Sequence, residues 1–168
     1  MKTKDILIAL FISIVALGAL IVTNNISQNK KSQENQENKL SESFLVAQEK
    51  TFDFGTISMA KGPVTHEYVI TNTGGRATLV RTLYTSCMCT QAALQTAEGT
   101  FGPFGMPGHG FIPAINAAIN PQEQSRVIVT FDPAAHGPAG VGKIGRSIIL
   151  ENDSGAPVEL RFTANVTP

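Results

Sequence analysis

Apolar and polar residues alternate along most of the chain after residue 44. The alternation is regular over 158–166, where every second side chain is apolar. Period-two patterns of this kind predict β-strands with one buried face. The other runs with this pattern lie at 52–57, 64–70, 79–83, 127–131 and 146–150. About seven strands separated by turn clusters predict an all-β, immunoglobulin-like sandwich over residues 44–168.

The N-terminal part of the chain has a different pattern. Residues 6–22 are almost continuously apolar, and Lys2 and Lys4 precede them. A helix over this run would span about 26 Å, close to a hydrocarbon core of about 30 Å. We therefore predict that residues 1–23 form one transmembrane helix that anchors the protein. A cleaved signal peptide is the alternative, although the run exceeds the usual core of about 7–15 residues and no A-x-A site follows.

Residues 24–43 are almost wholly polar, so they cannot bury enough apolar surface to fold alone. We predict a disordered tether there. Whether the N-terminal run is an anchor or a signal peptide, the β domain is expected on the extracytoplasmic side, periplasmic or extracellular.

Charge and motifs exclude several function classes. The chain carries 13 Lys and Arg against 13 Asp and Glu, so no net field attracts nucleic acid. It has no P-loop, no G-x-S-x-G, no H-E-x-x-H and no dinucleotide fingerprint. No pair of carboxylates is spaced for acid–base work. We predict that the protein is not an enzyme.

Five motifs follow one another in an order that resembles the bacterial family called domain of unknown function 1573. They are FDFGTI, HEYVITNTGG, TSCMCT, VIVTFDP and RSIILEND, and they extend over about residues 52–166. The resemblance implies a membrane-anchored or secreted sandwich related to the Hydin-type immunoglobulin folds, and it implies no activity. Two features depart from the family pattern: Met88 stands where glycine is expected, and a glycine-rich insertion occupies about 99–116.

Cys87 and Cys89 are the only cysteines. On an extended strand their Cα atoms would lie about 6.6 Å apart on one face, which disfavours a relaxed disulfide. Two thiolates on one metal ion need sulfurs only about 3.8 Å apart. The spacing therefore predicts a metal clamp.

Two glycine- and proline-rich loops offer further ligands for this clamp. Met106 and His109 lie in the insertion, and His136 lies in the loop DPAAHGPAGVG. Thiolate, thioether and imidazole together suit Cu(I), with Zn(II) second. We predict a soft-metal site of Cys87, Cys89, Met106, His109 and His136, over which both loops fold back.

Two other functions stay open. In a non-catalytic interaction or scaffold module that binds a protein of the cell envelope, the cysteines would be core residues and an apolar patch would lie on Phe101, Phe104 or Phe111. A thiol redox protein would need an accessible cysteine beside a group such as Arg81 or His109.

Overall fold

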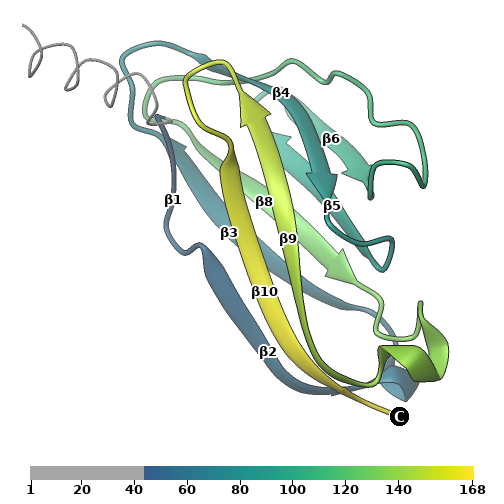
Figure 1. Ribbon diagram of the computed structural model, residues 1–168. Helices are drawn as coiled ribbons and strands as arrows, with labels where there is room; N and C mark the ends of the chain where they lie inside the picture. Colours follow the sequence, from purple (N-terminus) through teal and green to yellow (C-terminus); the bar gives the residue numbers. More distant parts are fainter. Residues whose placement is uncertain (1–43) are drawn as a thin grey trace, which may run out of the picture. The chain divides into compact units, whose positions relative to one another are not determined.

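The computed structural model describes residues 44–168 (Figure 1). The predicted transmembrane helix at 1–23 and tether at 24–43 lie outside these residues. Within 44–168, none of the helices has the length and apolar character needed to cross a membrane.

Ten strands form two five-stranded sheets in a sandwich-like arrangement (Figure 1). The order in one sheet is β1 (Leu45–Ala47), β3 (Val64–Asn72), β8 (Gln124–Phe131), β5 (Thr90–Thr96) and β6 (Gly99–Phe104). The order in the other is β2 (Thr51–Ser58), β10 (Val158–Thr167), β9 (Gly142–Asn152), β4 (Thr78–Thr85) and β7 (Ala117–Ile119). Two 3₁₀ turns complete the domain, η1 (Met59–Lys61) and η2 (Gly137–Gly140). The all-β prediction is confirmed, with ten strands where about seven were expected.

The core follows the period-two pattern of the longest strands. Along β10, alternate side chains from Val158 to Val166 are buried, and along β8 Val127 and Val129 are fully buried. Side chains of the two sheets meet between the layers, where the rings of Phe131 and Phe162 lie 5.2 Å apart. Burying each such side chain stabilises the fold by about 1.5–3 kcal/mol.

The cysteine segment is not an extended strand, so that prediction is wrong. The chain leaves one sheet at the end of β4 and enters the other at β5, and Cys87 and Cys89 lie in the turn between them. The N–H of Thr90 donates to Cys87 O at 3.1 Å, which closes the turn. The Thr85 hydroxyl lies 3.0 Å from Cys87 O and 2.9 Å from Thr90 O. The buried Thr85 hydroxyl thus has hydrogen-bond partners within the turn.

The glycine-rich insertion is more ordered than the sequence suggests. We expected a loop over about 99–116, but its first part forms β6, which pairs antiparallel with β5. Residues 105–116 contain no strand or helix. The chain touches β5 closely at Gly102, whose φ is +112° and where an added Cβ would lie 3.0 Å from Ala92 O. Glycine is therefore needed at this position to let β6 reach its neighbour.

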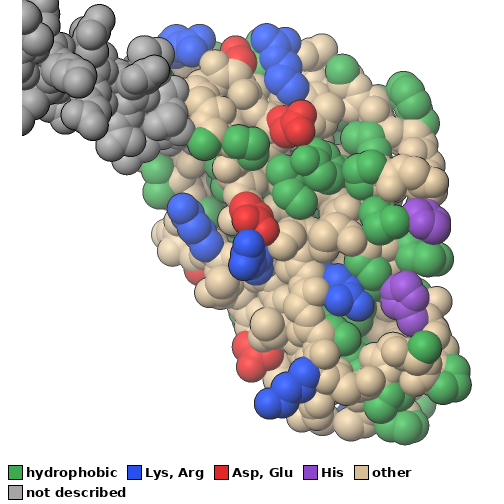
Figure 2. Space-filling view, viewed as in Figure 1, with side chains coloured by type: hydrophobic (Ala, Val, Ile, Leu, Met, Phe, Trp, Pro, Cys, Tyr) green, Lys and Arg blue, Asp and Glu red, His purple; other side chains and the backbone are tan. Residues whose placement is uncertain are grey.

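Positive and negative side chains are interspersed on the face shown in Figure 2. No single sign of charge gathers on that face, which agrees with the balanced composition of the chain.

Candidate functional site

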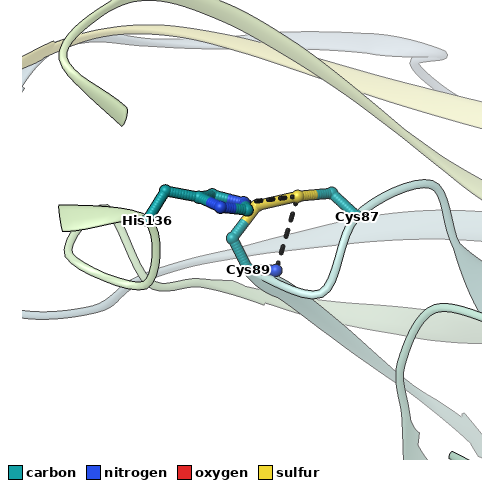
Figure 3. A group of neighbouring side chains, drawn as sticks. All are labelled: Cys87, Cys89 and His136. Atoms are coloured by element: carbon teal, nitrogen blue, oxygen red, sulfur yellow. Dashed lines mark hydrogen bonds between the residues drawn. A yellow bond between two sulfur atoms is a disulfide. The ribbon is translucent and has the colours of Figure 1, made fainter. Parts of the chain in front are cut away.

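Two connections of the sandwich meet at the cysteine pair (Figure 3). Cys87 and Cys89 come from the β4–β5 turn, and His136 comes from the β8–β9 connection, just before η2. The N–H of Asp132 donates to Cys89 O at 2.9 Å and so ties the second connection to the first. A turn follows, because Asp132 Oδ1 accepts from Ala134 N at 2.9 Å. This turn carries His136 back toward the sulfurs.

The imidazole of His136 contacts Cys87 directly. Its Nε2 lies 3.1 Å from Cys87 Sγ, and one ligand atom from each of Cys87, Cys89 and His136 lies within 4.8 Å of the other two. The predicted association of His136 with the cysteines is therefore present in the structure. The loop at 132–141 does fold back over the pair.

Both cysteine residues are buried, whereas two of their neighbours are exposed. Cys87 is 9% exposed and Cys89 is 3% exposed. His136 is exposed, and Met88 between the cysteines is 49% exposed. An ion or a small reagent would therefore reach the sulfurs from the side of His136 and the turn.

The two sulfur atoms lie at disulfide distance. The prediction that the backbone holds them apart is wrong, because the turn brings their Cα atoms to 5.3 Å. That value falls within the range of about 4.4–6.8 Å seen for disulfides.

Arg146 is a member of the site that the sequence analysis missed. Its Nε donates to Cys89 Sγ at 3.3 Å, while its Nη1 donates to Gly145 O at 2.8 Å. Arg146 lies on β9, which pairs with β4, and Ser86 N donates to Ser147 O at 2.9 Å. This pairing sets the guanidinium beside the cysteine turn.

A signal for Arg146 was present in the sequence. Counting in steps of two along β9 places Arg146 between Ile144 and Ile148, which both pack on the core. The pleat of a strand sends all three side chains to the same face. A charged residue at an inward position is a candidate site residue because it needs a partner there.

Met106 and His109 lie in the 105–116 loop. The N–H of His109 donates to Met106 O at 3.2 Å, and the His109 side chain is exposed. The loop begins beside the cysteine turn, since Thr85 N donates to Gly105 O at 3.1 Å. Among residues 44–168, the Cys–Cys–His cluster takes its histidine from the other loop. The roles of Met106 and His109 as ligands stay predictions.

Arg81 is engaged away from the cysteines. Its Nη1 donates to Asn116 Oδ1 at 2.8 Å, and its Nη2 lies 3.8 Å from Asp153 Oδ2. Arg146 is therefore the cation that contacts a cysteine sulfur, where the sequence suggested Arg81 or His109.

The fold and site define a two-sheet β domain that carries a Cys–Cys–His cluster at a crossing between its sheets. Residues 45–102 match a family model described as protein of unknown function (DUF1573). The family resemblance is thereby confirmed, and the matched segment includes both cysteines. No curated protein matches the sequence.

Several solved structures resemble the domain at low sequence identity. A protein of unknown function from Porphyromonas gingivalis W83 aligns with a TM-score of 0.54 at 12% identity, over 76% of this chain and 48% of that one. The secreted serine protease VesC from Vibrio cholerae aligns with a TM-score of 0.47 at 13% identity, over 79% of this chain and 25% of that one. The ASH/PapD-like domain 7 of human CEP192 aligns with a TM-score of 0.44 at 10% identity, over 74% of this chain and 86% of that one. The chain spans about half the length of the Porphyromonas protein, and the likeness at these identities concerns the fold alone.

Proposed function

We propose that the protein is an extracytoplasmic, immunoglobulin-like sandwich domain that binds one soft metal ion, Cu(I), through reduced Cys87, reduced Cys89 and His136. The observation that carries this proposal is the cluster of their three ligand atoms within 4.8 Å. Two thiolates and one imidazole are donors that suit Cu(I), with Zn(II) second.

The donor set fits such an ion once the pair is reduced. Two thiolates on a metal need a sulfur–sulfur separation of about 3.8 Å, which is more than the roughly 2.05 Å of a disulfide bond. Rotation about χ1 of either cysteine can supply the difference without moving the backbone. The metal-binding form of the site is therefore the dithiol form.

Charge favours a monovalent ion in this cluster. Two thiolates and one Cu(I) leave one net negative charge, and the Arg146 guanidinium beside Cys89 balances it. With Zn(II), the metal and the two thiolates would be neutral together, which would leave the Arg146 guanidinium as one unbalanced positive charge beside buried Cys89. Buried charge is costly unless it is balanced, so Cu(I) is preferred.

The location belongs to the same proposal. It is supported by the apolar run at 6–22 and by the family resemblance, which implies membrane-anchored or secreted domains. The proposal includes an anchor at 1–23, a domain outside the cytoplasm, a protein partner in the cell envelope and no catalytic role for the metal.

A scaffold module is the second candidate, and two observations favour it. Both cysteines are buried, and Phe111 in the 105–116 loop is 88% exposed. A large apolar side chain presented in this way suits a contact with another protein. In that case the cysteines serve only as core packing or as a structural crosslink.

Anaerobic titration of the reduced full-length chain with Cu(I), and separately with Zn(II), tests the metal site. We expect tight one-to-one Cu(I) binding that is abolished in Cys87→Ser/Cys89→Ser. His136→Gln should weaken Cu(I) binding by at least about tenfold, because a ligand is lost. His66→Gln is the matched control, since His66 lies on β3 and pairs with Glu49.

Equal Cu(I) binding by the double serine variant would contradict the metal site. Absence of binding, with thiols that react only after unfolding, would instead favour the scaffold module. His109→Gln and Met106→Leu, titrated in the same way, test whether the second loop completes the coordination.

A further inference from the structure

The two sulfur atoms of the cysteine pair differ in access and in contacts. Cys87 is the more exposed of the two, at 9% against 3%, and its neighbour is the exposed imidazole of His136. Cys89 is more deeply buried and lies against the guanidinium of Arg146. A purely structural crosslink requires neither the asymmetry nor a cation on the buried sulfur.

We propose that the Cys87–Cys89 pair is a thiol–disulfide exchange centre that oxidises thiols, in which Cys87 is the attacked sulfur and Cys89 is the departing one. This activity goes beyond the metal site proposed above and does not depend on it. Its substrate class is a thiol on a small molecule or on a protein.

The exchange proceeds in two balanced steps. A thiolate R–S⁻ attacks Cys87 Sγ, forms a mixed disulfide R–S–S–Cys87, breaks the bond to Cys89 and leaves the electron pair on Cys89 Sγ. A second thiolate R–S⁻ attacks the sulfur of R in the mixed disulfide and releases R–S–S–R and the Cys87 thiolate. Two substrate thiols are thereby oxidised to one disulfide while the protein disulfide is reduced to two thiols.

The difference in solvent exposure identifies Cys87 Sγ as the attacked sulfur. Exchange requires an attacking thiol to reach one sulfur of the disulfide along its bond axis. Met88 and His136 are the exposed residues of the site. Cys87 contacts His136 and has the larger exposed fraction of the two cysteines. Both cysteines pack in the core, and the smaller exposed fraction of Cys89 makes attack at its sulfur the more hindered of the two.

The contact with Arg146 identifies Cys89 Sγ as the departing sulfur. Cleavage would leave negative charge on the sulfur of a buried residue, and this charge is costly unless a nearby group stabilises it. The Arg146 Nε–H points at Cys89 Sγ from 3.3 Å, and a guanidinium keeps its proton in proteins. By stabilising the reduced product, Arg146 makes the disulfide a stronger oxidant, so it is a positioning and charge-stabilising residue for the exchange.

The test equilibrates the oxidised full-length chain with reduced and oxidised glutathione in the presence of a metal chelator. Alkylation followed by mass spectrometry counts disulfide, mixed disulfide and dithiol in the folded protein. We expect the whole population of folded protein to exchange reversibly with glutathione without denaturant. Arg146→Gln should shift the equilibrium toward the protein disulfide by about tenfold, the size of one charge-assisted hydrogen bond. Arg146→Lys should restore part of the shift.

Two single-cysteine variants test the order of the sulfurs. With oxidised glutathione, Cys89→Ser, which retains Cys87, should form the glutathione adduct severalfold faster than Cys87→Ser. Arg161→Gln is the matched control for the charge, because it removes a guanidinium from the neighbouring strand β10, where Arg161 pairs with Glu159 at the surface. Its exchange equilibrium should equal that of the unaltered chain.

Three results would overturn the proposal: a disulfide that glutathione reduces only after unfolding, an equilibrium that Arg146→Gln leaves unchanged, or faster adduct formation at Cys89 than at Cys87. If Arg146→Gln does not fold, the exchange equilibrium of Arg146→Lys and the adduct rates of the two serine variants still test the proposal. Because the chelator removes metal, failure of exchange leaves the Cu(I) titration unaffected. Loss of Cu(I) binding likewise leaves the exchange measurement valid.

Discussion

Cys87 and Cys89 have unlike surroundings although a single residue separates them. An imidazole contacts one sulfur and a guanidinium contacts the other. We propose that the same pair serves as soft metal ligands when reduced and as an exchangeable disulfide when oxidised, and that Arg146 stabilises the Cys89 thiolate once the disulfide is reduced. At the scale of single residues, the chemistry of the site depends on these two neighbours.

Tyr68 illustrates how one side chain joins the two sheets. It is fully buried on β3, and its hydroxyl donates to Arg161 O on β10 at 2.6 Å. Burial, with a smaller contribution from the negative charge of Glu49, raises the pKa of Tyr68 well above its usual value. The hydroxyl therefore stays protonated and remains a donor at any ordinary pH.

We expect Tyr68→Phe to lower the free energy of unfolding by about 1–2 kcal/mol, because the buried carbonyl of Arg161 loses its donor. Urea denaturation followed by circular dichroism measures the change. Tyr84→Phe is the control, since the Tyr84 hydroxyl donates to Glu151 Oε1 at an exposed position. Equal denaturation midpoints for the two variants would contradict this role of Tyr68.

One polar side chain links two of the connections between strands. Glu123 stands just before β8 and accepts from Asn120 N at 2.9 Å and from Ala97 N, in the β5–β6 turn, at 2.7 Å. Burial raises the pKa of Glu123, but hydrogen bonds from Asn120, Ala97 and Ser125 outweigh burial and lower that pKa below the usual value. One carboxylate thus holds two turns together.

The stability contributed by Glu123 should depend on pH. Its pKa is lower in the folded than in the unfolded chain, so its contribution is complete above the ordinary value of 4.5 and is lost as pH falls through the folded value. Glu123→Gln should cost about 1 kcal/mol at pH 7, a figure reduced for solvent screening. The difference in unfolding free energy from the unaltered chain should shrink below pH 4.5.

Unfolding measured from pH 7 to pH 3, beside Glu98→Gln in the adjoining turn, checks this expectation. Glu98 is exposed, so its substitution should change stability little at any pH. A Glu123→Gln difference that is constant across the pH range would contradict the pKa argument.

Regular strands were predictable from the sequence because their period-two pattern is local. The pattern located β3, β8 and β10 correctly, whereas β1 and β7 have three residues each and are too short to show a period. TSCMCT was expected to be extended, but it forms a turn where the chain crosses between the sheets, and local pattern does not encode that crossing. His136 was predicted from its loop, while Arg146 depended on the pairing of β9 with β4.

The site is a product of the whole domain. Cys87 and Cys89 come from the β4–β5 turn and His136 from the β8–β9 connection (Figure 3), and Arg146 comes from β9. The segment that matches the family model, 45–102, contains the cysteines, while His136 and Arg146 lie beyond it. The reactivity that we propose therefore depends on residues outside the matched segment as well as on the Cys-x-Cys motif.

X-ray absorption at the copper edge of the Cu(I)-loaded, full-length chain tests the metal site most directly. We predict two sulfur scatterers and one imidazole nitrogen, with the nitrogen lost in His136→Gln and both sulfurs lost in Cys87→Ser/Cys89→Ser. A copper environment of nitrogen and oxygen alone, or a sulfur count that the double serine variant leaves unchanged, would contradict it.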